Sequence, residues 1–128
     1  MSKILIQIFL IIFFTNAFGE VIKNVEVSGN KRISKETVLV LGNISTGQNF
    51  EKKDLNNSLK KLYDSNFFKD IQLTINNGIL NINLIENPII EDIEIAGNKN
   101  KTFNKEILES IKLKNRMSFT EDQLKKDI

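Results

Sequence analysis

Apolar and polar residues alternate in three short stretches, which predicts β-strands that each bury one face. The stretches are Val21–Ser28, Phe67–Ile75 and Leu80–Leu84. A period of two is typical of a half-buried strand. Asn77-Gly78 separates the last two stretches, and an Asn-Gly pair between alternating runs indicates a tight hairpin turn. We therefore expect one strand at the start of a unit and a β-hairpin at its end.

Two segments between these strands have the apolar spacing of helices. Leucines recur at i, i+4 and i+7 within Lys52–Ser65, and Asn66 follows as a residue that tolerates the left-handed turn after a helix. Ser34 is a typical N-cap for a shorter helix, which gives way to a loop at Gly42–Asn49. The order is β-α-α-β-β. We expect an α+β fold in which two helices cover one face of a three-stranded sheet.

The same pattern occurs twice along the chain. Ile22–Lys31 is echoed by Ile90–Lys99, with Gly29 and Gly97 lying 68 residues apart. Internal repeats define structural units more firmly than propensity does. Pro88 cannot extend a hydrogen-bonded ladder, so it marks the boundary between the two copies.

The second copy is expected to begin like the first but to stop before its hairpin. Its pattern predicts a strand at Ile89–Ile95, a helix near Asn104–Ile111 and a helix that starts near Thr120. The tandem unit is therefore predicted to be truncated in this sequence.

The N-terminus resembles a targeting segment rather than part of the fold. Met1–Lys3 is basic, Ile4–Phe14 is apolar, and Ala17-Phe18-Gly19 offers small residues for a signal peptidase. The alternative is an uncleaved membrane anchor, although the apolar run is shorter than a spanning helix requires. We expect residues 1–19 to be a cleaved signal peptide, residues 20–87 the first unit and residues 88–128 the start of the second.

The composition removes several kinds of chemistry. The chain has no histidine and no cysteine, so imidazole bases, thiol nucleophiles and disulfides are excluded. Eighteen basic side chains nearly balance 16 acidic ones, which gives no electrostatic footprint for nucleic acid. The glycines of Gly42–Gly47 imitate a phosphate loop, but Gln48 and Asn49 stand where Lys and Ser/Thr are required. We expect no enzyme activity, no cofactor and no metal.

Glycine and asparagine mark the expected turns. Gly29 and Gly97 each end a strand just before a helix entry, where a positive φ or a close helix–sheet approach favours glycine. The alternative is that Gly29–Arg32 and Gly97–Lys99 are basic binding loops. The residues expected to form structural turns are Gly29, Asn30, Asn66, Gly78, Gly97 and Asn98.

Three segments together resemble a POTRA (polypeptide-transport-associated) domain. They are Ile22–Ile33 with its Val-x-Val-x-Gly-Asn-x-Arg pattern, Gly47-x-x-Phe50, and Leu62–Ile71. Glu86–Lys99 is similar to the junction between consecutive POTRA domains. Asn66 stands where the family usually has glycine, but asparagine tolerates the same turn.

The resemblance implies a periplasmic module of an outer-membrane protein assembly factor. It implies unfolded outer-membrane proteins and accessory lipoproteins of the machinery as partners. It also implies further repeats and a C-terminal membrane barrel, neither of which lies in this sequence, so we expect a fragment or truncated product. The alternative is a cell-division scaffold with one POTRA domain and a membrane anchor.

The resemblance further implies that clients bind by adding a strand to an exposed sheet edge. An edge presents unpaired N–H and C=O groups to another extended chain. The expected client-binding residues are Phe68, Lys69, Asp70, Ile71, Gln72, Leu73, Thr74 and Ile75. Thr74→Pro is expected to weaken binding if the Thr74 amide faces outward.

Overall fold

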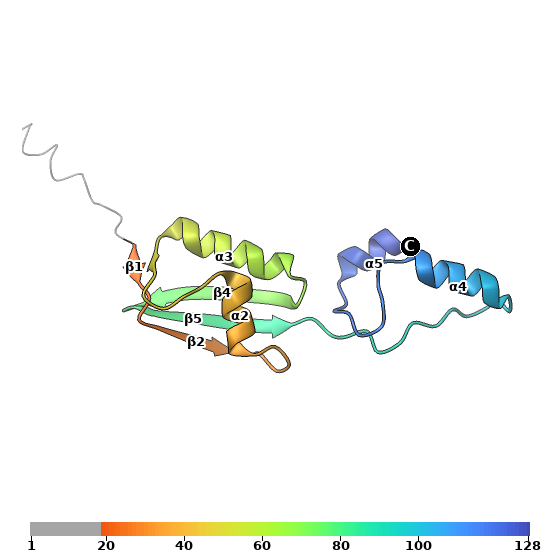
Figure 1. Ribbon diagram of the computed structural model, residues 1–128, viewed down its shortest axis with the longest axis horizontal. Helices are drawn as coiled ribbons and strands as arrows, with labels where there is room; N and C mark the ends of the chain where they lie inside the picture. The colour runs from red at the N-terminus through yellow and green to blue at the C-terminus, as the bar shows by residue number, and fades with distance from the viewer. Residues whose placement is uncertain (1–18) are drawn as a thin grey trace, which may run out of the picture.

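A computed structural model describes residues 19–128, and the signal peptide predicted for residues 1–19 lies almost wholly outside this range. Figure 1 shows two units joined by a single stretch of chain, which we call the first unit (residues 20–87) and the second unit (residues 88–128). The elements in chain order are β1 (Glu20–Val21), β2 (Asn24–Ser28), α2 (Lys35–Gly42), β3 (Asn49–Phe50), α3 (Lys52–Asp64), β4 (Phe68–Asn76), β5 (Ile79–Glu86), α4 (Lys101–Ser110) and α5 (Glu121–Asp127). None of the helices in the described part of the chain is long and apolar enough to cross a membrane.

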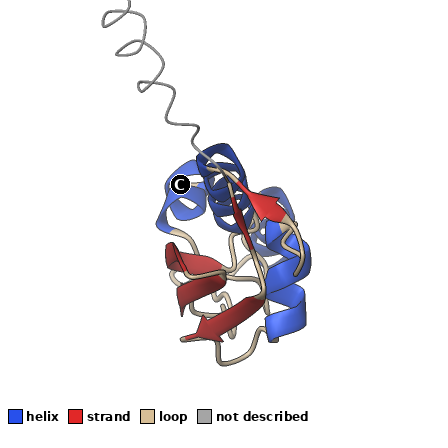
Figure 2. Ribbon diagram, turned by 90° about the vertical axis from the view of Figure 1, so that its left-hand side faces the viewer, coloured by secondary structure: helices blue, strands red, loops and turns tan. Residues whose placement is uncertain are grey.

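The first unit contains a three-stranded sheet in the order β2-β5-β4. The central strand β5 pairs in parallel with β2 and antiparallel with β4. Asn77 and Gly78 have φ of 54° and 80°, the left-handed conformations that a two-residue hairpin of type I′ requires. The α+β fold expected from the sequence is confirmed. Both helices of the unit lie on one side of the sheet (Figure 2).

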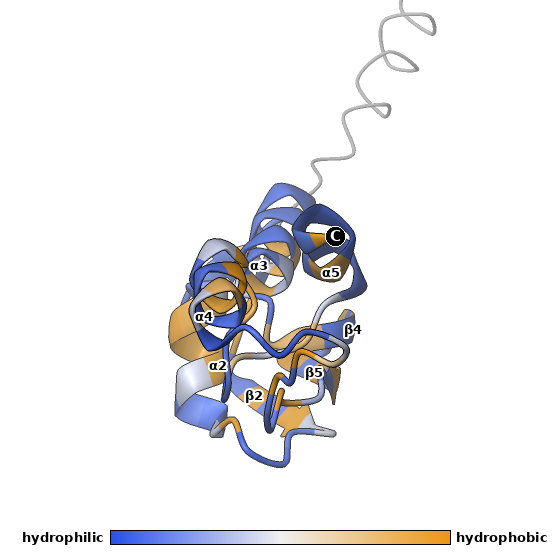
Figure 3. Ribbon diagram, turned by 90° about the vertical axis from the view of Figure 1, so that its right-hand side faces the viewer, coloured by the Kyte–Doolittle hydropathy of each residue, from blue (hydrophilic) through white to orange (hydrophobic). Residues whose placement is uncertain are grey.

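The two helices begin at side-chain caps and cover the apolar face of the sheet. Ser34 accepts a hydrogen bond from the Thr37 N–H at the start of α2, as predicted, and Glu51 and Asp54 form a reciprocal capping box on α3. In Figure 3, α2 passes from hydrophilic at its first residues to hydrophobic at its last ones, whereas α3 is mostly hydrophilic because only one stripe of it packs on the core. The buried core residues of the unit are Ile22, Val25, Val38, Ile44, Phe50, Leu62, Phe68, Ile71, Leu80, Ile82 and Leu84.

A small antiparallel pair, β1 with β3, links the start of the unit to the loop between its helices. The Ile22 N–H donates to the Gln48 carbonyl over 2.9 Å, and the Ile22 carbonyl accepts from the Gly47 N–H over 2.6 Å. Each strand has two residues, which is too short to produce a periodic pattern. No sequence pattern predicts this pair, and Asn49 was expected to lie in a loop.

The second unit repeats these two backbone hydrogen bonds at the equivalent positions. The Ile90 N–H donates to the Met117 carbonyl over 2.9 Å, and the Arg116 N–H donates to the Ile90 carbonyl over 2.7 Å. Ile89 and Ser118 form an isolated antiparallel bridge. Both expected helices are present, as α4 and α5, and Thr120 caps α5. The repeat read from the sequence therefore extends to backbone hydrogen bonds.

The strand predicted at Ile89–Ile95 is wrong. Beyond the bridge at Ile89, residues 90–95 have no regular secondary structure. In the first unit the corresponding β2 is held by β5, whereas the second unit has no strand beside these residues within the described chain. An alternating pattern forms a strand only where a neighbour accepts its backbone groups.

The repeat also exposes one strained position. Arg116 has φ of 67° where its counterpart Gly47 has 82°, and a side chain at positive φ costs about 1 kcal/mol. Arg116→Gly is therefore expected to stabilise the second unit by about 0.5–1 kcal/mol. Native-state hydrogen exchange of the Ile90 amide measures this effect. Faster exchange in the variant would contradict it.

Candidate functional site

The outer edge of β4 presents a row of backbone groups that do not pair with β5. The two-residue turn makes Asn76 and Ile79 a hydrogen-bonded pair, so Thr74 and Gln72 also turn their backbone groups toward β5. In this part of β4, the N–H and C=O groups of the odd-numbered residues therefore point away from β5, toward the outer edge of the sheet. These residues are Ile71, Leu73 and Ile75.

Tyr63 forms a hydrogen bond with the first of these outward groups, the N–H of Ile71. Its hydroxyl accepts a hydrogen bond from the Ile71 N–H over 3.1 Å and donates one to Asp70 Oδ1 over 3.3 Å. Tyr63 lies in the last turn of α3, whose end packs beside the start of β4. For the backbone of Leu73 and Ile75, the structure records no hydrogen bond on the outer side among residues 19–128.

The opposite edge of the sheet, β2, is partly closed. The Asn24 N–H donates to the Gly78 carbonyl within the sheet, so the backbone groups of Val25 and Val27 face outward. Lys35, at the start of α2, donates from its ammonium group to the Val25 carbonyl over 2.5 Å. A lysine at an edge is a common device against unwanted strand pairing. The two edges are thus unequal, and β4 is longer and more open.

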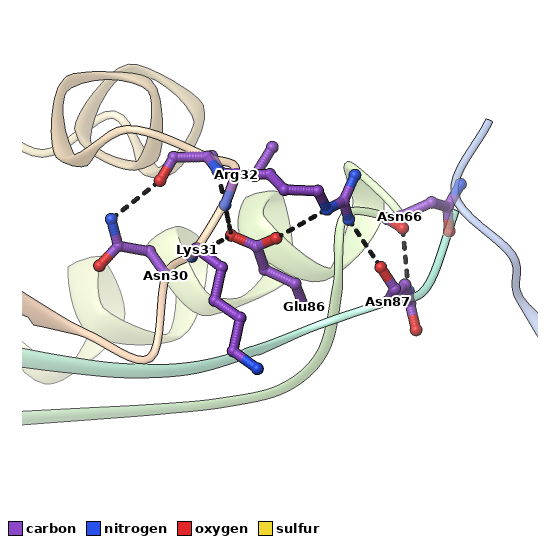
Figure 4. A network of polar contacts seen from close by, with 7 residues as sticks. Asn30, Lys31, Arg32, Asn66, Glu86 and Asn87 are labelled. Carbon is purple, nitrogen blue, oxygen red and sulfur yellow. Dashed lines mark hydrogen bonds and ion pairs between the residues drawn. The ribbon is translucent and has the colours of Figure 1, made fainter. Parts of the chain in front are cut away.

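A buried carboxylate joins the β2–α2 loop to the end of β5 (Figure 4). Glu86 Oε1 accepts hydrogen bonds from the backbone N–H groups of Lys31, Arg32 and Ile33 over 2.7–3.0 Å. Its Oε2 lies 3.1 Å from Arg32 Nε, which is an ion pair without hydrogen-bond alignment. Arg32 also donates to the Asn87 carbonyl over 2.7 Å. The loop that resembles a basic binding site is therefore occupied by a side chain of its own unit.

The surroundings of Glu86 favour its charged form. Burial of the carboxyl alone would raise the pKa of Glu86. The N–H groups of Ile33, Lys31 and Arg32, together with the Arg32 guanidinium, outweigh that effect and hold this pKa below its ordinary value. The role of Glu86 is structural, since its lone pairs point into the fold.

An open cleft of about 700 Å³ lies where the two units meet. Tyr63 and Phe68 line it from the first unit, and Phe119 and Glu121 line it from the second. Asn87, at the junction, donates from Nδ2 to the Asn66 carbonyl and from its backbone N–H to the Phe67 carbonyl. The cleft therefore opens beside the first residues of β4.

A family model for POTRA, described as a surface antigen variable number repeat, matches residues 20–87. The chain belongs to the POTRA family. The outer membrane protein assembly factor BamA of Neorickettsia risticii is 34% identical over 93 residues, which cover 73% of this chain and 13% of the relative. The chain thus spans about an eighth of that relative's length.

Solved structures show the same fold at low identity. The N-terminal domain of Omp85 from Thermosynechococcus elongatus has a TM-score of 0.59 and 17% identity, over 84% of this chain and 47% of the other. The POTRA1-3 region of Omp85 from Anabaena has a TM-score of 0.54 and 13% identity, over 86% of this chain and 48% of the other. At these identities the likeness concerns the fold alone.

The POTRA fold places the predicted client-binding residues on both faces of one edge strand. Phe68 and Ile71 are buried, while Leu73 and Ile75 are partly buried on the helix side. On this strand the exposed residues are Lys69, Gln72, Thr74 and Asn76, and Asp70 is partly buried. The Thr74 amide faces β5, so Thr74→Pro would break the hairpin and is not a test of client binding. The outward amides are those of its odd-numbered neighbours.

The predicted turn residues of this POTRA chain have different roles. Gly29, Gly78 and Gly97 have φ of 80–87°, and Asn66 has φ of 59°. A Cβ at Gly29 would lie 2.0 Å from the Leu84 carbonyl oxygen, so the close approach is between two strands and not between helix and sheet. Asn30 donates to the Ile33 carbonyl, and Asn98 accepts from the Asn100 N–H.

Two residues that shape this site, Tyr63 and Glu86, were not predicted from the sequence. The Tyr63 side chain meets β4 only through the packing of α3, and no local pattern marks its hydroxyl. Glu86 was part of the junction motif, but its contacts lie more than 50 residues away in sequence. Within residues 19–128, no group of three or more acidic side chains is arranged to hold a metal ion.

Proposed function

We propose that this chain is a periplasmic module of outer-membrane protein assembly that binds unfolded outer-membrane proteins by strand addition at β4. The observation that carries the proposal is the outward row of backbone groups on β4. Among residues 19–128, those of Leu73 and Ile75 have no recorded hydrogen-bond partner. The relationship to the BamA of Neorickettsia risticii supports a role in such an assembly machine. Accessory lipoproteins of the machinery belong to the same proposal as partners.

The side chains along β4 favour a client of alternating polarity. Leu73 and Ile75 are partly exposed on the helix side of the edge, while Gln72 and Thr74 are exposed on the other side. A strand added here places alternate residues beside these two environments. Strands of outer-membrane barrels alternate apolar and polar residues in segments of about ten residues. The apolar residues of such a segment would lie beside Leu73 and Ile75, and its polar residues beside Gln72 and Thr74.

The same family relationship supports a proposed location. The N-terminal 19 residues are proposed as a cleaved signal peptide that exports the chain, which then acts at the periplasmic face of the outer membrane as part of a larger assembly factor. The absence of histidine and cysteine supports a binding role without catalysis.

Ile75→Pro, compared with Ile75→Ala, tests the proposed binding. Both variants lose the Ile75 side chain, but only proline removes the outward N–H, which edge strands tolerate because no ladder bond is lost. A ten-residue peptide that alternates valine or leucine with serine, threonine or asparagine serves as the client.

The proline variant is expected to bind this peptide about tenfold more weakly than the alanine variant, since one backbone hydrogen bond and close approach are lost. Isothermal titration measures the two dissociation constants, and circular dichroism checks that both variants fold. Equal affinities of the folded variants would refute strand addition at this position.

A further inference from the structure

Tyr63 imitates a client strand at one position of the β4 edge. An added strand would place a backbone carbonyl opposite each outward N–H of β4. At Ile71 that acceptor position is already filled by the Tyr63 hydroxyl, 3.1 Å from the nitrogen. The same hydroxyl donates to Asp70 Oδ1, so both its donor and its acceptor capacity are used.

The Tyr63 cap divides the outward N–H groups of β4 into two classes. The Ile71 N–H is satisfied within the folded chain, whereas those of Leu73 and Ile75 face outward without a recorded partner in residues 19–128. A client therefore gains the last two donors directly but must displace a phenol to gain the first. This competition lowers the affinity for any client long enough to reach Ile71.

The geometry around Tyr63 allows the ring to move. Tyr63 is 40% exposed, and it lines the open cleft of about 700 Å³ between the two units. Within residues 19–128, the recorded hydrogen-bond partners of the Tyr63 hydroxyl are the Asp70 carboxylate and the Ile71 N–H. A ring displaced into the cleft keeps its hydroxyl in contact with water, so displacement leaves no buried polar group unsatisfied.

We propose that the Tyr63 hydroxyl is a removable cap on the client-binding edge, which a sufficiently long client strand displaces from the Ile71 N–H. The inference rests on the proposed binding at β4 and adds a residue that sets how far along the edge a client pairs. Short clients pair at Leu73 and Ile75 alone. Long clients also pair at Ile71 and turn the Tyr63 ring out.

Tyr63 provides its own probe because it is the single tyrosine of a chain without tryptophan. Tyrosine fluorescence responds to loss of the hydrogen bond to Asp70. The full chain is titrated with the ten-residue alternating peptide, which contains neither tyrosine nor tryptophan. We expect the Tyr63 emission to change with the same dissociation constant that the amide shifts of Leu73 and Ile75 give.

Tyr63→Phe removes the cap while keeping the ring, and Asp70→Ala loosens the cap while keeping the phenol. Tyr63→Phe is expected to bind the peptide about three- to tenfold more tightly, with faster exchange of the Ile71 amide in the free protein. Asp70→Ala is expected to shift both quantities in the same direction by a smaller factor. A peptide shortened to reach only Leu73 and Ile75 should bind wild type and Tyr63→Phe equally.

The outcomes separate the cap from the proposed function. If the peptide shifts the amides of Leu73 and Ile75 while Tyr63 emission and the affinity of Tyr63→Phe stay unchanged, the cap is refuted and binding at β4 stands. If the peptide leaves those amides unmoved, strand addition at β4 fails and the cap on client binding fails with it. The cap can also be refuted without any peptide. That result would be an exchange rate of the Ile71 amide that is the same in both variants as in the wild type.

Discussion

Replacing Gly29 with alanine is expected to destabilise the first unit by about 3 kcal/mol. The new Cβ would lie 2.0 Å from the carbonyl oxygen of Leu84, on the central strand β5. Neither backbone can withdraw without separating β2 from β5, because the two strands pair up to Ser28 and Asn83. The positive φ of 82° adds strain of its own.

Gly97→Ala is the matched control for this prediction. Gly97 has φ of 87°, close to that of Gly29, but a Cβ there would meet nothing within 4 Å. Its cost is expected to be about 1 kcal/mol, from backbone strain alone. Urea unfolding of the two variants, followed by circular dichroism, measures both effects. If the two substitutions cost the same, the close approach of β2 and β5 does not explain the glycine at position 29.

Glu86→Gln is expected to cost about 2–3 kcal/mol of stability, because the carboxylate accepts three backbone N–H groups and pairs with Arg32. Glutamine keeps the shape of the side chain but loses its charge. Whichever way the amide is turned, its NH₂ group faces either the three backbone N–H groups or the Arg32 guanidinium, so that two donors oppose each other. Glu26→Gln, at an exposed strand position, should change stability by less than about 0.5 kcal/mol. Equal effects in the two variants would contradict the structural role of Glu86.

The same comparison has a defined pH dependence. The pKa of Glu86 is lowered in the folded state, so its stabilisation is present above the ordinary glutamate pKa of about 4.3 and is lost as the pH falls through the lower folded value. The stability difference between wild type and Glu86→Gln should therefore shrink as the pH falls below about 4. A difference that stays constant down to about pH 2 would show that the charge of Glu86 contributes nothing.

Local patterns were sufficient to predict most of the first unit. The hairpin follows from alternation on both sides of Asn77-Gly78, and α3 follows from the spacing of its leucines. The cap of α2 was readable because Ser34 bonds to a backbone group only three residues away. Each of these features is decided by residues that are neighbours in sequence.

The features that sequence reasoning missed depend on contacts between distant segments. The β1–β3 pair joins residues 20–21 to residues 49–50, and neither strand is long enough to show a period. Ile89–Ile95 has the alternation of a strand but no neighbour to pair with in the described chain. The contacts of Glu86 arise only once β5 and the β2–α2 loop are brought together by the fold.

The candidate site was predicted only in part for the same reason. The sequence and the family resemblance pointed to the strand after the second helix, and β4 does form one edge of the sheet. Which of its amides face outward depends on the register of the hairpin, and this register places Thr74 toward β5. The contact between Tyr63 and Ile71 depends on how α3 packs against that strand.

Amide hydrogen exchange along β4, with and without the ten-residue alternating peptide, tests strand addition most directly. We expect the peptide to slow exchange at Leu73 and Ile75, whose N–H groups face outward. Exchange at Gln72 and Thr74 should change little, because their N–H groups already pair with β5. Slower exchange confined to α2 and α3, with Leu73 and Ile75 unchanged at saturating peptide, would contradict binding at the β4 edge.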